Sequence, residues 1–140
     1  MLQIRPLQRS QIAQMLPVLQ QAEPRTEMRL IRCLVSRSET RGMAGIMAVA
    51  GPDGMIRGGF AYEVEIGSDG TRALSVHHLA IPQLGQARVA GIIERAVESL
   101  AQAQNCGAVR IRLPGDAEWE AGYFAGHGHE VVRDPLPAAH

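Results

Sequence analysis

The spacing of hydrophobic positions changes several times along the chain, and each change predicts a new element. A short alternation of apolar and polar residues at 2–7 predicts a first strand. Apolar residues then recur at helical spacing, which predicts a helix capped by Ser10 and a second helix over 23–38 that opens near Pro24. Pro17 lies inside the first of these helices, where a proline kinks or ends the helix.

The spacing becomes that of strands after Gly42. Three apolar runs at 43–50, 55–66 and 71–81 are joined by the short stretches GPDG and GSDG. Glycine and aspartate are typical of tight turns between antiparallel strands. The middle of the chain is therefore predicted to be an antiparallel meander of three strands.

Helical spacing returns after Pro82 in one long apolar stripe, which Gly107 is predicted to end. Residues 108–113 then alternate as a strand, with the arginines on one face and the aliphatic residues on the other. A short helix at 116–126 and a last strand at 129–132 follow. The chain thus closes with a helical crossover between strands.

The order of these elements, βααβββαβαβ, predicts a single domain over residues 1–140. An antiparallel meander followed by a βαβ crossover indicates an α/β (α+β) fold, with a mixed, mostly antiparallel central sheet of about six strands flanked by helices. In such sheets a ligand binds at the carboxyl end of the strand that feeds the crossover helix. The candidate site is therefore expected at 81–90.

Composition and charge exclude several classes of partner. The chain has 14 basic and 14 acidic residues, so its formal net charge is zero, and we expect neither nucleic acid nor a membrane as a partner. All the basic residues are arginines, which excludes a P-loop because that loop needs a lysine. Cys33 and Cys106 follow no metal-binding or redox spacing, and no leader or membrane span is evident. We therefore expect free thiols and a cytoplasmic location.

The adjacent His77 and His78 are the most chemically suggestive pair in the chain. Because side chains alternate along a strand, His77 is expected to share a face with Ser75, Leu79 and Ile81, and His78 is expected to lie on the opposite, more apolar face. His78 is thus predicted to be a hydrogen-bonded core histidine.

The spacing of histidine, serine and cysteine residues does not indicate a metal site or a nucleophilic catalytic residue. His77 and His78 are expected to diverge, and the HGH stretch at 127–129 falls in a loop, so we predict no metal site. Ser75 lacks the glycine context of a nucleophilic serine, and neither cysteine has an evident activating neighbour.

The strand LSVHHLAIP that feeds a helix, and the closing YFAGHGHEVV, resemble the GNAT superfamily of acetyl-CoA-dependent N-acyltransferases. The element order agrees over nearly the whole chain. The resemblance implies acetyl-CoA as cosubstrate and a small-molecule or peptide amine as acceptor. A homodimer is compatible with the sequence. In that family the turn after the fourth strand holds the pyrophosphate of coenzyme A, and the strand splays from its neighbour to admit the pantetheine arm.

Ile81 and Pro82 match the family's strand end, but Gln86 and Arg88 stand where the family has glycine. A side chain there crowds the anion if the backbone must adopt a positive φ. Arg88 either gives a guanidinium to the phosphate or lies on a solvated helical turn. The resemblance implies a backbone contact from the Ile81 N–H to the thioester carbonyl. The implied coenzyme A contacts are Leu79, Ala80, Ile81, Gln86, Ala87, Arg88, Val89, Ala90 and Phe124.

The family's general base falls on His77, four residues before the strand end, with a purely structural histidine as the alternative. The family's acid, a tyrosine, falls on Phe124, so the candidate acid is the neighbouring Tyr123, about 100° around the helix, or else a packing residue. Ala117 replaces the family's asparagine. Two hypotheses follow: an N-acetyltransferase, or a catalytically impaired GNAT-fold protein that serves as a binding or regulatory module.

Overall fold

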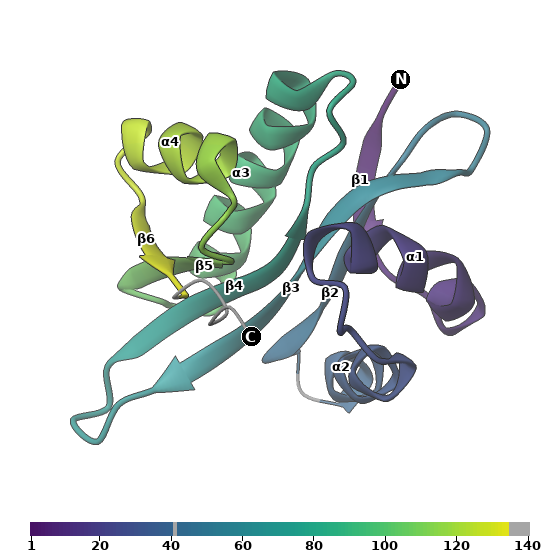
Figure 1. The fold of residues 1–140 in the computed structure, drawn as a ribbon. Helices are drawn as coiled ribbons and strands as arrows, with labels where there is room; N and C mark the ends of the chain where they lie inside the picture. The colour runs from purple at the N-terminus through teal and green to yellow at the C-terminus, as the bar shows by residue number, and fades with distance from the viewer. Residues whose placement is uncertain (41, 135–140) are drawn as a thin grey trace, which may run out of the picture.

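A six-stranded sheet, whose strands lie side by side in chain order, organises the molecule (Figure 1). The computed structural model describes residues 1–40 and 42–134. The strands are β1 (Gln3–Pro6), β2 (Ala44–Ala50), β3 (Ile56–Ile66), β4 (Arg72–Ala80), β5 (Ala108–Leu113) and β6 (Glu130–Arg133). Neighbours from β1 to β4 are antiparallel, whereas β4, β5 and β6 are parallel. The predicted mixed, mostly antiparallel sheet is confirmed.

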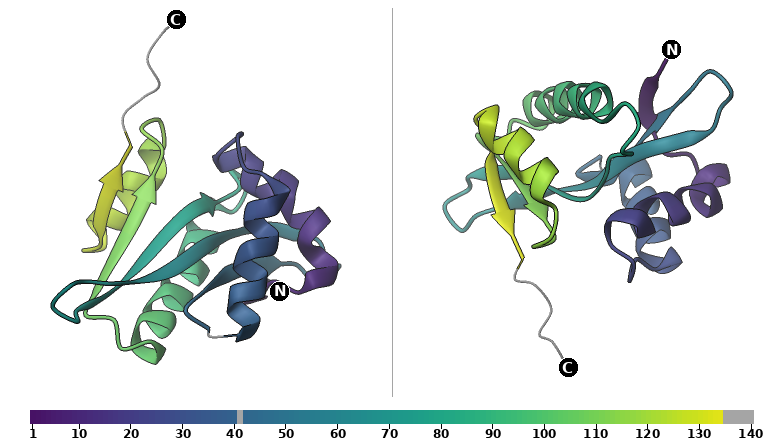
Figure 2. Two further views of the ribbon diagram at one scale, coloured as in Figure 1. Left: turned by 90° about the horizontal axis from the view of Figure 1, so that it is seen from below. Right: turned by 45° about the horizontal axis from the view of Figure 1, so that its top comes forward.

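The helices cover both faces of this sheet. They are α1 (Ile12–Ala22), α2 (Met28–Thr40), α3 (Gln86–Ala103) and α4 (Glu118–Gly126), with a 3₁₀ turn, η1 (Arg9–Gln11), before α1. One face packs on α1 and α2, the other on α3 and α4 (Figures 1 and 2). The largest fully buried side chains on the α3 and α4 side include Phe60, Leu74, Ile93, Ile111 and Phe124.

The first helix differs from its prediction at two residues, Ser10 and Pro17. Ser10 lies in η1, and α1 begins after Gln11 with no side-chain cap. Pro17 neither ends α1 nor stops it from reaching Ala22. Met15 and Leu19, on either side of Pro17, are fully buried against the sheet. Their packing outweighs the backbone hydrogen bond that the proline removes.

Two other helix boundaries shift for local hydrogen-bonding reasons. The second helix begins at Met28, because the carbonyl of Glu23 accepts hydrogen bonds from the backbone and hydroxyl of Thr26 and so closes a turn first. At the end of α3, Asn105 takes the left-handed conformation, with φ 54°, that we expected at Gly107. The N–H of Cys106 then reaches back to the carbonyl of Ala101 at 2.8 Å, as in a Schellman motif.

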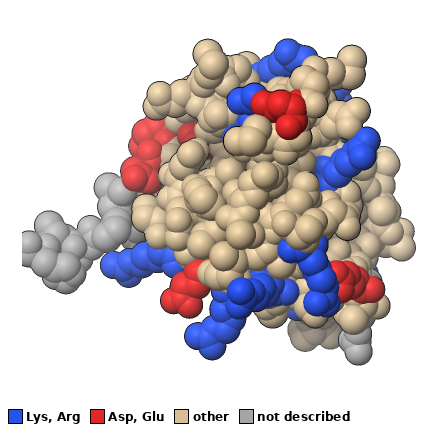
Figure 3. All heavy atoms as spheres, turned by 90° about the vertical axis from the view of Figure 1, so that its right-hand side faces the viewer, with Lys and Arg blue, Asp and Glu red and all other residues tan. Residues whose placement is uncertain are grey.

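Charged side chains do not gather by sign on the face drawn in Figure 3. In its described part, acidic residues lie beside arginines around the rim of a largely uncharged centre. Among the described residues, the helices are all too short or too polar to cross a membrane.

Candidate active site

The sheet opens between β4 and β5. Their parallel pairing runs from Ala73–Ala108 to Val76–Ile111 and stops there, although both strands continue. Beyond this level β4 pairs only with β3, and β5 pairs only with β6. The two strands therefore part along 77–80 of β4, and we call this opening the notch. It is the splay that the family resemblance implies.

A β-bulge sits on β4 at the mouth of the notch. His77 pairs with Ala61 and Ala80 pairs with Gly59, so β4 has one more residue than β3 between these pairs. The extra residue is accommodated at His78, whose φ is 50°. A bulge interrupts the alternation of side chains. The sequence pattern could not show where this interruption falls.

The bulge brings the two histidine rings together, so the prediction that they point to opposite faces is wrong. Their Nδ1 atoms are 2.7 Å apart, and the ring centroids are separated by 4.9 Å. Leu79 instead joins the core beneath α3, so its predicted placement beside His77 is also wrong. His78 is not a core histidine: its side chain is 16% exposed and lines a surface cavity.

Two carboxylates flank the histidine pair. Oε1 of Glu63 lies 3.4 Å from Nε2 of His77, and Oε2 of Glu23 lies 3.3 Å from Nδ1 of His78. The same Glu23 oxygen accepts a hydrogen bond from the His78 backbone N–H at 3.1 Å. Because ionised carboxylates only accept, we assign protons to Nε2 of His77 and Nδ1 of His78. Nε2 of His78 is then the nitrogen left with a free lone pair.

The surroundings of the pair favour neutral imidazoles. Burial, the neighbouring His78 and Arg112 lower the pKa of His77 below its ordinary 6.5, against the opposing effect of Glu63. Burial likewise lowers the pKa of His78, although Glu23 and Glu63 oppose it. A neutral imidazole at pH 7 can accept a proton, which a general base must do.

These lowered pKa values predict a pH dependence of stability. Below pH 6.5 the unfolded chain binds protons that the folded pair resists, so the free energy of unfolding falls as the pH drops from about 6.5 toward the lower folded pKa values, and levels off below them. Urea denaturation of the wild type and of a His77→Asn, His78→Asn double variant, from about pH 8 to about pH 5, measures this difference. Equal pH slopes for the two proteins would contradict it.

A cavity of about 350 Å³ opens beside His78, between the end of α1 and the start of α2. Its lining residues include Glu23, Thr26, Arg29, Cys33 and His78. Glu23 and His78 thus line the same space. A carboxylate attracts an ammonium group, and an imidazole can take its proton.

The turn before α3 has a positive φ at a glycine and not at the two positions where the family has glycine. Gly85 has a φ of 73° and forms the N-cap, whereas Gln86, Ala87 and Arg88 already belong to the first helical turn. A positive φ is therefore not required at Gln86 or Arg88, so the condition under which their side chains would crowd an anion is not met in this structure. The first-turn N–H groups of a helix lack intrahelical partners, and no acidic residue occupies this turn. The turn can therefore attract an anion.

The other residues implied to contact coenzyme A differ in how far their side chains are exposed to solvent. Arg88 and Ala87 are exposed, and Gln86 and Ile81 are partly buried. The remaining side chains are buried, so only their backbone groups are available to a ligand in this structure: Leu79, Ala80, Val89 and Ala90. The Phe124 side chain is fully buried in the core and presents no surface to coenzyme A here.

Tyr123 lies on α4, with its hydroxyl directed toward α3. The hydroxyl is 3.5 Å from Oε1 of Glu94, and the ring stacks between Trp119 and His127. Burial and the charge of Glu94 raise the pKa of the Tyr123 phenol, so it stays protonated at neutral pH. Tyr123 and His77 lie on opposite sides of the sheet, and the structure does not bring them into contact.

Glu23, Glu63 and Glu94 are the residues that sequence reasoning missed. Glu63 lies on the strand next to the histidines, and its position follows from the register of the β3–β4 hairpin. Pairing that hairpin from its GSDG turn would have placed Glu63 beside the histidine strand. No comparable signal places Glu23 or Glu94.

Comparison with known proteins identifies similar solved structures but no sequence relative. No protein-family model and no curated protein matches this sequence. Among solved structures, AAC(6')-Iy in complex with the bisubstrate analog CoA-S-monomethyl-acetylneamine is 11% identical, with a TM-score of 0.76 over 100% of this chain and 98% of that chain. Aminoglycoside antibiotic 6'-N-acetyltransferase AAC(6')-Ih from Acinetobacter baumannii is 12% identical, with a TM-score of 0.75 and the same coverage.

A transcriptional regulator from Bacillus halodurans is also similar, with 11% identity and a TM-score of 0.72 over 100% of each chain. Two of these three structures are therefore N-acetyltransferases, and one has a regulatory name. The likeness extends over the whole chain. The protein has the fold of the GNAT acetyltransferases.

Proposed function

We propose that this protein is an N-acetyltransferase that uses acetyl-CoA to acetylate a small-molecule or peptide amine. The observation that carries the proposal is the notch. A neutral histidine pair lies at its mouth, and α3 begins after it with no acidic residue in the first turn. The fold likeness to N-acetyltransferases supports it. The free thiols of Cys33 and Cys106 support a reducing, cytoplasmic location.

Different residues around the notch would bind the cosubstrate, accept the proton of the amine and position the base. The pyrophosphate of the cosubstrate would meet the first-turn amides of α3 and the guanidinium of Arg88. The amine would enter from the cavity beside Glu23 and give its proton to Nε2 of His78, while His77 and Glu63 hold that ring in its tautomer. The amine nitrogen then bonds to the acyl carbon, and the carbon–sulfur bond breaks.

Two further groups would assist this transfer. The backbone N–H of Ile81 would stabilise the negative charge on the acyl oxygen, a contact that needs no particular side chain. The departing thiolate needs a proton, and Tyr123 is the candidate donor, since its phenol stays protonated. Its position against Glu94 requires the hydroxyl to turn toward the notch when the cosubstrate binds.

Calorimetry and thermal unfolding with acetyl-CoA and free coenzyme A test the proposal. Saturable binding should raise the free energy of unfolding by about 2.7 kcal/mol when the ligand is about 100 times its Kd. Arg88→Ala should weaken binding, whereas Arg95→Ala, an exposed arginine further along the same helix, should not. Absence of stabilisation by millimolar ligand would overturn the proposal.

The competing function is a binding or regulatory module without turnover. The departures at Gln86, Arg88, Ala117 and Phe124 favour it, as does the likeness to a protein named as a transcriptional regulator. An assay of thiol release from acetyl-CoA distinguishes the two functions. A module of this kind would bind coenzyme A yet release no thiol from acetyl-CoA in the presence of a broad panel of amines.

A further inference from the structure

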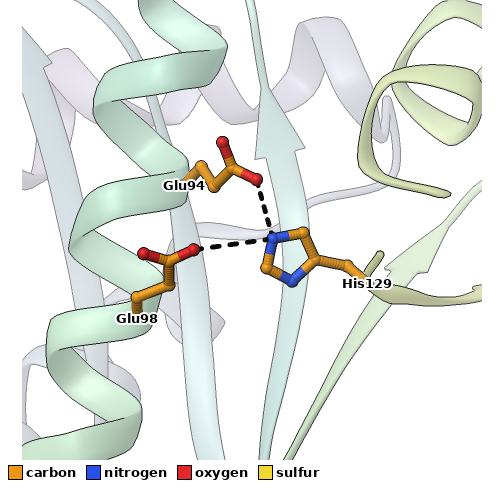
Figure 4. Close-up of side chains that lie close together, drawn as sticks. All are labelled: Glu94, Glu98 and His129. Atoms are coloured by element: carbon orange, nitrogen blue, oxygen red, sulfur yellow. Dashed lines mark hydrogen bonds and ion pairs between the residues drawn. The ribbon is translucent and has the colours of Figure 1, made fainter. Parts of the chain in front are cut away.

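A second cluster of histidine and carboxylate side chains lies away from the notch, between α3 and the loop that joins α4 to β6. Nε2 of His129 is 2.8 Å from Oε2 of Glu94 and 3.9 Å from Oε1 of Glu98 (Figure 4). One ligand atom from each of the three residues lies within 4.8 Å of the others. Glu94 and Glu98 are one helical turn apart, so both point to the same side of α3.

The cluster has the chemistry of a metal site. An imidazole nitrogen and two carboxylate oxygens are ligands that zinc and related divalent ions accept. In tetrahedral zinc sites with ligand distances near 2.1 Å, ligand atoms lie about 3.4 Å apart, between the two His129 distances in this structure. All three ligand atoms lie within 4.8 Å of one another, so binding an ion requires them to draw closer by about 1.4 Å at most.

The local charge also favours a divalent cation. With a neutral imidazole, Glu94 and Glu98 bring two negative charges to one side of α3, and a divalent ion would neutralise them. The Glu94 and His129 side chains are only 15% and 13% exposed, so these two ligands are partly shielded from water. Glu98 is exposed and leaves the ion accessible from solvent.

The second oxygen of Glu94 has its own partners, which hold the carboxylate in place. Oε1 lies 3.2 Å from Nδ1 of His127 and 3.5 Å from the Tyr123 hydroxyl. Hydrogen bonds to the outer oxygen of a carboxylate ligand orient it toward the metal. The His127 ring is held in turn by stacking on Tyr123, with ring centroids 4.2 Å apart.

We propose that Glu94, Glu98 and His129 bind a divalent transition-metal ion of the zinc type, with His127 orienting Glu94. Water takes the fourth position, as in zinc sites with three protein ligands. The ion ties the middle of α3 to the loop at 127–129. This inference does not depend on acetyl transfer, and it replaces the prediction of no metal site.

Calorimetric titration of the full chain with zinc chloride tests the site. Wild type should bind one ion with saturation in the micromolar range. Glu98→Gln should weaken binding at least about tenfold. Glu98 is 60% exposed and its contact with His129 is long, so this substitution preserves the fold. His129→Asn should abolish binding, with folding checked by circular dichroism.

Two controls locate the ion. His78→Asn removes the other histidine cluster and should leave zinc binding unchanged. Cobalt in place of zinc should show weak visible bands without the strong near-ultraviolet band of a thiolate ligand, since Cys33 and Cys106 take no part. Absence of saturable zinc binding, wild-type affinity in Glu98→Gln, or a thiolate band would each overturn the proposal.

Discussion

Replacing His78 by asparagine is expected to lower kcat/KM for acetyl transfer by about 100-fold or more, because positioned general bases contribute on the order of 10² to 10⁴ in rate. Asparagine suits this test, since it tolerates the φ of 50° at the bulge better than other residues do. The bulge and the notch are therefore preserved while the proton acceptor is removed. Thiol release from acetyl-CoA, measured with a panel of amines, provides the rate.

Glu63→Gln separates positioning from proton transfer. Because the charge of Glu63 raises the pKa of both histidines, its removal should move the acid limb of the rate profile to lower pH. The matched control is Glu65→Gln, two residues along the same strand, which pairs with Arg110 and Arg112 instead. Wild-type rates in His78→Asn, with coenzyme A binding intact, would contradict this assignment of the base.

Gly59→Ala is expected to lower the free energy of unfolding by about 3 kcal/mol or more, or to prevent folding. A Cβ at this position would lie 2.2 Å from the Met47 carbonyl oxygen and 2.7 Å from the end of the Met15 side chain, and φ is 154°. The methionine can move, but the backbone oxygen is fixed in the sheet. Urea denaturation, or the yield of folded protein, measures the loss.

Gly107→Ala is the matched control for this substitution. A Cβ there would meet no heavy atom within 4 Å, and its φ is not positive. The free energy of unfolding should change by less than about 0.5 kcal/mol. A Gly59→Ala variant as stable as Gly107→Ala would show that the sheet relaxes around residue 59.

Periodicity and turn chemistry allowed most of the fold to be predicted. The alternation at 108–113 and the glycine–aspartate turns correspond to strands and hairpins, because burial on one face and a tight turn leave few alternatives. Two helix boundaries failed because of local hydrogen bonds, whereas the failures at α1 and at the histidines depend on contacts from distant parts of the chain. Packing keeps α1 intact through Pro17, and a single bulge turns His78 toward Glu23, 55 residues earlier.

The candidate site was only partly predictable for the same reason. The turn before α3 follows from local pattern, and the resemblance to the GNAT family singled out His77 and Ile81 on the same continuous segment. The partnership of His77 with His78 and Glu63 depends on strand register and on the bulge, neither of which a single sequence reveals. Tyr123 was found from its spacing, but its contact with Glu94 depends on how α4 packs on α3.

The chain-order arrangement of the sheet has a consequence for how the molecule folds and opens. Antiparallel neighbours from β1 to β4 need only short loops or the α1–α2 connection, whereas β5 can pair with β4 only after α3 has crossed over. That parallel pairing is four residue pairs long. The seam between β4 and β5 is therefore the weakest connection between two units of the sheet, β1–β4 and β5–β6, and α3 packs across both of them. Any molecule seated in the notch would contact both units and couple their local unfolding.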